Sequence, residues 1–118
     1  MRRIVTAFFL MLIALTARAE MTVAQYESGL QTKRTAEIVR LYVHGLGDGM
    51  AWANEIPGQA PFYCTPANKP VGDEEYFDLI NLQIEASNSQ MSAGEVANLS
   101  VGLLLLKGLQ EVFPCKGN

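Results

Sequence analysis

The sequence predicts an all-α domain: a compact bundle of about four helices closed by one intramolecular disulfide. Three observations lead to this prediction. Apolar residues recur every three or four positions in four separate segments, which is the period of an amphipathic helix. No segment alternates polar and apolar residues in the way a half-buried strand does. Finally, the chain of 118 residues suffices for one domain and contains two cysteines.

The first 19 residues have the layout of a secretory signal peptide. Two arginines precede an apolar run over residues 4–15, and the small-residue motif Ala17-Arg18-Ala19 follows. The run is too short to cross a bilayer about 30 Å thick, so cleavage after Ala19 is favoured over a membrane anchor. We therefore expect a leader over 1–19 and a single helical domain over 20–118, exported to the periplasm of a Gram-negative bacterium.

The charge of the expected mature chain argues against polyanionic partners. Removal of the leader takes away Arg2, Arg3 and Arg18, which leaves six basic residues against twelve acidic ones and a net charge of −6. A surface of this sign repels nucleic acid and anionic lipid. We expect neither of them as a partner, and we expect no membrane association after cleavage.

The two cysteines are expected to pair. Cys64 and Cys115 would lie in an oxidising compartment after export, where a disulfide is the usual outcome. The bridge would fasten the end of the last helix to the middle of the chain, at a place where fraying would otherwise begin.

The first two predicted helices run over residues 22–30 and 35–54. Thr22 and Gln25 have the spacing of a capping box at the start of the first. The second carries Gly45 and Gly49 in a stripe that we expect to face the core, where the two glycines would allow close packing against the last helix. The same pair of glycines leaves a homodimer open as the alternative. The apolar stripe consists of Ile38, Leu41, Tyr42, Gly45, Leu46, Gly49, Trp52 and Ala53.

The rest of the chain predicts a long loop and two further helices. Four of the five prolines fall in residues 55–72, which we interpret as an irregular connection that contains Cys64. Asp73 is the expected cap of the third helix, and residues 86–92 form a polar break. Ser92 and Glu95 then have capping-box spacing at the start of the last helix, which ends at Pro114.

Groups able to carry out chemistry are few. His44 is the single histidine, and Asp48 lies four residues further along the same helix. A surface pair explains this spacing better than half of an acid–base site, because no serine or free cysteine completes a triad. The acidic residues 73–75 are expected to serve a helix start rather than a metal. We therefore expect no enzymatic activity, no metal and no cofactor.

Three motifs, taken in order, resemble a known family. Tyr42, Gly45 and Gly49 stand in "YVHGLGDGM", Cys64 and Pro66 in "FYCTP", and Phe113, Pro114 and Cys115 in "FPCK". This order is similar to that of the Tai-type periplasmic immunity proteins found beside type VI secretion systems. The resemblance covers most of residues 22–116. The chain departs from the family pattern in the segment "SNSQMS", where members of the family often have a His-Pro pair.

The resemblance implies a helical fold, often dimeric, with bridged cysteines and no reaction of its own. It also implies that the chain inhibits an effector amidase, a peptidoglycan-cleaving toxin, by occluding its active-site groove. The matched positions do not include the inhibitory surface. The alternative is a periplasmic envelope-stress or chaperone-like binding protein with no toxin partner. Exposure and charge suggest two candidate contact segments, which contain Ser87, Asn88, Ser89, Gln90 and Met91 in one and Asp73, Glu74 and Glu75 in the other.

Overall fold

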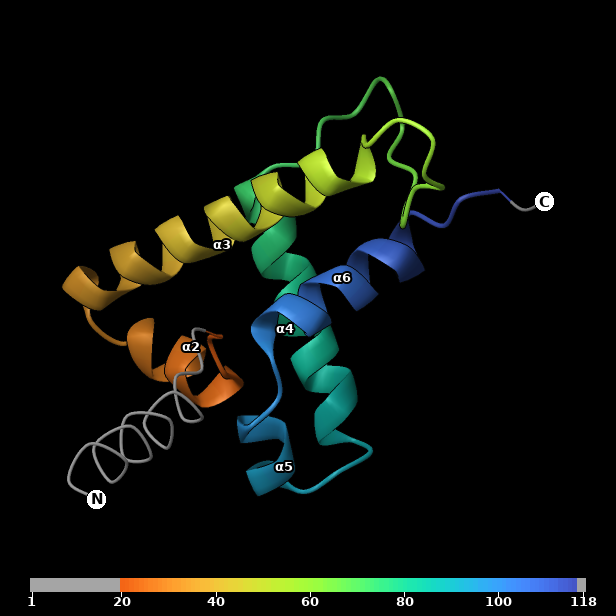
Figure 1. Cartoon of the computed structure of the whole chain (residues 1–118). Coiled ribbons are helices and arrows are strands. Elements are labelled where there is room, and N and C mark those ends of the chain that lie inside the picture. The colour runs from red at the N-terminus through yellow and green to blue at the C-terminus, as the bar shows by residue number, and fades with distance from the viewer. Residues whose placement is uncertain (1–19, 117–118) are drawn as a thin grey trace, which may run out of the picture.

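A computed structural model describes residues 20–116, and the expected leader over 1–19 lies outside the described residues. The described part contains helices and no strand, which confirms the all-α prediction. Figure 1 shows α4 at the centre, with α6 crossing it and α3 along one side. In this view α2 lies below α3, and α5 lies at the bottom, beside the end of α4. The helices are α2 (Val23–Gly29), α3 (Lys33–Asn54), α4 (Asp73–Asn88), α5 (Ala93–Ala97) and α6 (Val101–Val112).

The core forms where α4 packs against α6 and α3. At one close contact, a Cβ on Gly108 of α6 would lie 3.1 Å from the Cβ of Leu79 on α4. The absence of a side chain at Gly108 thus lets the two helices touch. The largest fully buried side chains are those of Tyr26, Ile80, Leu105, Leu109, Gln83, Val23, Val43 and Val101.

The predicted buried face of α3 is right in part: Tyr42 and Leu46 are half-buried against the core, but three other large side chains of the predicted stripe are exposed. Ile38 is 60% exposed, and Leu41 and Trp52 are each 72% exposed, whereas Val39 and Val43 are buried. The helix carries two apolar stripes, both with helical spacing, and periodicity does not say which of them meets the core. Packing against α4 and α6 buries the stripe that contains Val39 and Val43.

The predicted close-packing role of Gly45 and Gly49 is wrong. A Cβ added at either position would meet nothing within 4 Å. The close approach occurs at Gly47, where a Cβ would lie 2.1 Å from the ring of Tyr76. The neighbour is thus a side chain of α4 and not the backbone of the last helix.

The predicted last helix is two helices. Ser92 caps α5 through a capping box with Glu95, as the sequence predicts, but α5 ends at Ala97. The backbone of Leu99 then accepts a hydrogen bond from the N–H of Val23 at 3.0 Å, and Ser100 caps α6. Asn98 and Ser100 offer side-chain hydrogen bonds that compete with a continuous helix. Leu103 of α6 lies outside the core and is 66% exposed.

The other boundaries are close to the predicted ones. The capping box of Thr22 and Gln25 is present, and α3 begins two residues before the predicted start because Thr32 caps it. The third helix runs on to Asn88, into the segment expected to be a polar break.

The predicted disulfide between Cys64 and Cys115 is present and closes the irregular connection after α3. Beside the bridge, the backbone N–H of Cys64 donates to the carbonyl of Phe113 at 2.8 Å. The side chain of Asn54 holds the same segment, since it donates to the carbonyl of Tyr63 at 2.7 Å and accepts from the N–H of Phe62 at 2.6 Å. The middle of the loop is therefore fastened to α3 and to the end of α6.

Candidate protein-binding surface

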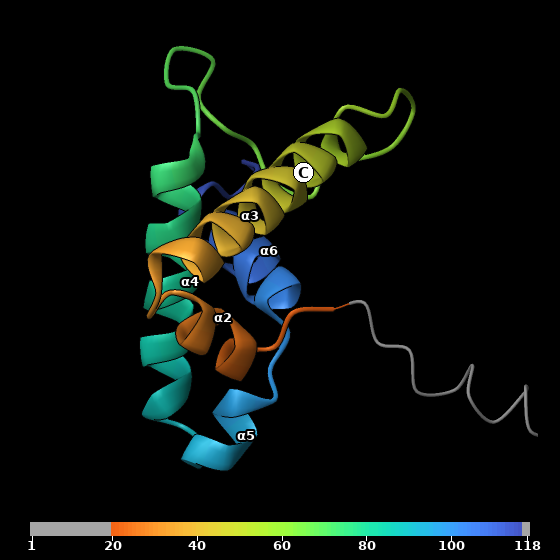
Figure 2. The same ribbon diagram turned by 90° about the vertical axis from the view of Figure 1, so that its left-hand side faces the viewer.

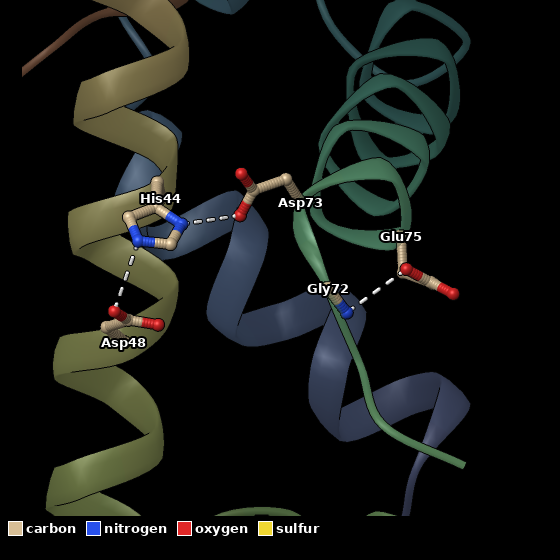
Figure 3. Close-up of polar contacts among 5 residues, drawn as sticks. All are labelled: His44, Asp48, Gly72, Asp73 and Glu75. Atoms are coloured by element: carbon tan, nitrogen blue, oxygen red, sulfur yellow. Dashed lines mark hydrogen bonds and ion pairs between the residues drawn. The ribbon is translucent and has the colours of Figure 1, made fainter.

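The acidic start of α4 is held by interactions within the chain. Gly72, not Asp73 as predicted, is the residue that caps the helix, and its N–H donates to the carboxylate of Glu75 at 3.1 Å. Backbone hydrogen bonds, of Glu75 itself and of Gly72, hold the pKa of Glu75 below its ordinary value. Asp73 is instead the first residue of α4, and its carboxylate contacts another helix (Figure 3).

That contact is made by His44 of α3. Its Nδ1 lies 2.8 Å from a carboxylate oxygen of Asp73, and its Nε2 lies 3.3 Å from one of Asp48 (Figure 3). The sequence predicted the pair with Asp48, four residues away, and missed Asp73, which is 29 residues away. The hydrogen bond to Asp73 and the charges of Asp48 and Asp73 raise the pKa of His44 above 6.5. A protonated His44 thus ties α3 to the start of α4.

The raised pKa of His44 gives a direct prediction. NMR titration of this single histidine should show a pKa above 6.5, and Asp73→Asn should lower it more than Asp48→Asn, because the hydrogen bond to Asp73 is the largest contribution. The folded state binds the proton more tightly than the unfolded chain does. Its stabilising contribution is therefore complete below the unfolded pKa of about 6.5 and is lost as the pH rises through the folded pKa. Equal effects of the two substitutions would contradict this assignment.

A hollow of about 510 Å³ lies beside this acidic start. Its apolar lining comes from α4 and from the residue that ends α2, and its charged lining combines one guanidinium of α3 with three carboxylates of α4. Such a hollow suits a long side chain with an apolar stem and a cationic head. The lining residues are Leu30, Arg40, Asp73, Glu74, Phe77 and Asp78.

The sequence analysis predicted only some of the residues that line this hollow. Asp73 and Phe77 are four residues apart, as are Glu74 and Asp78, so all four share one side of a helix. That spacing could have shown Phe77 and Asp78 to be neighbours of the predicted acidic residues. Nothing local could have shown Arg40, because it belongs to α3 and reaches the hollow only through the packing of helices.

The second candidate segment forms the turn after α4. Ser87 is buried, and its hydroxyl donates to the carbonyl of Gln83 at 2.8 Å, so its predicted contact with a partner is wrong. Asn88, Ser89, Gln90 and Met91 are exposed. The N–H groups of Gln90 and Met91 both donate to the carbonyl of Ser87 at 3.0 Å, which makes the turn tight.

The two candidate segments lie at opposite ends of α4. The helix has 16 residues, which corresponds to a length of about 24 Å. The structure therefore does not bring them together, and they are two separate surfaces. Figure 1 shows the start of α4 beside α3 and its end beside α5.

Few of the described residues are arranged in a way that would suit catalysis or metal binding. Within residues 20–116, no three His, Cys, Asp or Glu residues lie close enough together to hold a metal ion. Both cysteines are in the disulfide, and the ring of His44 is exposed with each nitrogen against a carboxylate. Among the described helices, none is long and apolar enough to span a bilayer.

Comparisons with models of known protein families, with curated proteins and with solved structures give no significant match for this chain. The disulfide is the feature that bears on its location, because such bridges form and persist in oxidising compartments.

Proposed function

We propose that this chain is a periplasmic immunity protein that binds a peptidoglycan amidase effector of a type VI secretion system and inhibits it by occluding the active-site groove. The observation that carries the proposal is the acidic hollow beside the first turn of α4, which is suited to a cationic side chain of a partner. The ordered motifs at Tyr42, Cys64 and Phe113 support it by resemblance. The disulfide supports it as well, since the partner would be met in an oxidising compartment.

The start of α4 suits an inhibitory contact better than the turn at residues 88–91. It presents fixed negative charges, because Gly72 and His44 hold Glu75 and Asp73 in place. A binding surface that is already ordered loses little conformational freedom when a partner docks. The turn is exposed, but its residues 88–91 carry no charge.

Charge complementarity would serve the inhibition of a toxin. A negative patch speeds encounter with a positively charged groove and fixes the orientation in which the two proteins meet. Inhibition by occlusion requires only that the chain stay bound over the groove. The proposal therefore assigns no reacting group to this chain.

The test is an inhibition assay with the purified product of any amidase gene found beside this one, together with a direct measurement of binding. Neutralising the free carboxylates of the hollow with Glu74→Gln and Asp78→Asn together should weaken binding about tenfold or more. A matched variant, Glu37→Gln with Glu85→Gln, removes the same charge from exposed positions outside the hollow and should bind as the parent does. Binding should be measured by calorimetry or biolayer interferometry at two salt concentrations, because screening weakens a contact of this kind.

Two results would overturn the assignment of the contact to the hollow, and a third would overturn the proposed function. Equal loss of affinity in both double variants would mean that net charge matters and the hollow does not. Loss of affinity on replacing Gln90 and Met91, with none from the hollow variants, would move the contact to the turn. The absence of an amidase gene beside this one would favour a binding protein of the envelope without a toxin partner.

A further inference from the structure

A second, smaller pocket lies between the end of α3, the loop that follows it and the first turn of α4. Figure 2 shows the end of α3 and the start of α4 standing apart, with the connection running from one to the other. The pocket has a volume of about 110 Å³, well below the ~300–1,000 Å³ of sites that take drug-sized ligands, so it suits only a small group. We call it the tyrosine pocket, and its lining includes Asn54, Glu55, Tyr63, Thr65 and Tyr76.

Two buried tyrosines in this lining lack the hydrogen bonds that buried phenols usually make. Tyr63 is 4% exposed and Tyr76 is 5% exposed. Neither hydroxyl makes a hydrogen bond to another residue in 20–116. The buried Tyr26 differs from both, since its hydroxyl donates to the side chain of Asn81 at 2.9 Å. Buried tyrosine hydroxyls normally find a partner, so two without one in the same pocket indicate a missing ligand.

The two hydroxyls open into the tyrosine pocket. Within residues 20–116, the Oε1 atom of Gln83 is the only side-chain polar atom that is fully enclosed and has no partner. The two phenol oxygens therefore reach open space, and the pocket is the open space that both residues border. Burial is the main reason that the pKa of Tyr63 and that of Tyr76 are raised above 10. Both phenols thus keep their protons at neutral pH, and each oxygen can accept a hydrogen bond.

The charge around the pocket is negative. Glu55 lines it, is exposed and has no ion-pair partner among the described residues. The charges of Asp48 and Asp73 add to the effect of burial on the pKa of Tyr76, and the single His44 between them can neutralise only one of the two. No lysine or arginine is among the described residues that line the pocket. Phenol oxygens and a carboxylate together suit a cation that carries N–H donors.

We infer that the tyrosine pocket is a binding site for a primary alkylammonium group. The N–H donors of such a group match the phenol oxygens of Tyr63 and Tyr76 and the carboxylate of Glu55, and the two rings attract a cation as well. The site is ordered before a ligand arrives. Asn54 donates to the carbonyl of Tyr63 at 2.7 Å, and the ring of Tyr76 packs on Gly47. Little conformational freedom is therefore lost on binding.

This inference stands apart from the proposed function. The tyrosine pocket shares no lining residue with the acidic hollow, so either site can exist without the other. Two sources supply an alkylammonium group: a free aliphatic amine and the lysine side chain of another protein. The contacts in the pocket would be the same for both. A small amine tests the site itself, without any protein partner.

The test is an NMR titration with n-butylammonium chloride, on protein purified from cells that express the full chain. A ligand of so few atoms gains little free energy, so we expect a dissociation constant on the order of 1 mM. The amide signals of residues 54, 55, 63, 65 and 76 should move together. Signals of Arg40 and Phe77 report the acidic hollow separately. Sodium butyrate, which has the same chain length and the opposite charge, should leave the signals of the tyrosine pocket in place.

Two variants remove the proposed contacts without opening the core. Glu55→Gln removes the charge, and Tyr63→Phe with Tyr76→Phe removes both hydroxyls but keeps both rings. Each should raise the dissociation constant about fivefold or more. The phenylalanine variant should unfold at the temperature of the parent or above it, because the lost hydroxyls have no partner in 20–116. Glu85→Gln is the matched control, since it removes an exposed carboxylate that does not line the pocket.

The outcomes separate the site from its possible occupants. A loss of affinity for an amidase partner in Glu55→Gln would assign the ammonium group to a lysine of that partner, and unchanged affinity would assign it to a free amine. Three results would overturn the inference. They are no shift of the pocket signals up to about 100 mM butylammonium, an equal response to butyrate, and the affinity of the parent in both pocket variants.

Discussion

Replacing Cys64 and Cys115 together by serine is expected to lower the free energy of unfolding by about 4 kcal/mol. The bridge closes a loop with a sequence separation of 51 residues, and in the chain-entropy model a loop of that size accounts for this amount. Both cysteines are exposed, so serine should fit in the folded state without leaving a cavity. Urea unfolding of the two proteins, monitored by circular dichroism, measures the difference.

The loss should begin locally. Without the covalent link, the loop and the segment after α6 depend on weaker contacts. These are the backbone hydrogen bond between residues 64 and 113 and the hydrogen bond from Asn54 to Tyr63. Amide exchange should therefore accelerate first in residues 55–72 and at the end of α6. A double variant that unfolds within about 1 kcal/mol of the parent would contradict the chain-entropy account for this protein.

Gly47→Ala is expected to destabilise the fold by about 2–3 kcal/mol. The new Cβ would lie 2.1 Å from one ring atom of Tyr76 and within 2.6 Å of two more. Tyr76 is itself buried, so its ring cannot swing away without disturbing the contact between α3 and α4. Forcing extra atoms into a filled core costs about 1–3 kcal/mol, sometimes more, which outweighs the helix preference of alanine.

The matched control is Gly45→Ala, two residues away on the same helix. Nothing lies within 4 Å of a Cβ at that position, so the gain in helix propensity should leave stability unchanged or raise it by up to about 1 kcal/mol. Thermal and urea unfolding compare the two variants. A similar effect of both substitutions would show that Tyr76 does not pack on Gly47 as described.

Local chemistry in the sequence was enough to predict where most helices begin. Thr22 with Gln25 and Ser92 with Glu95 form the predicted capping boxes, because such a box needs only residues three positions apart. Four prolines were enough to predict the loop before α4. The disulfide was also predictable, since a chain with two cysteines permits a single pairing.

Within the hollow, sequence reasoning found the acidic residues of α4 but not their surroundings. Asp73 and Glu74 were expected at the surface from the charge of a helix start. The contact of Asp73 with His44 and the presence of Arg40 depend on α3, which is distant in sequence. No spacing rule joins residues on two helices linked by a long loop.

The sequence determined that this chain is helical, where two of its capping boxes and its long loop lie, and which cysteines are joined, because each of these depends on neighbours along the chain or on a single possible pairing. Only the tertiary structure decided which stripe of α3 is buried, since two stripes on that helix have equally good helical spacing. It decided likewise that Gly47 meets Tyr76 while Gly45 faces outward, and that the last helix breaks where Leu99 pairs with Val23. These features depend on contacts between segments far apart in the chain, and the free energy of such contacts cannot be inferred from local periodicity.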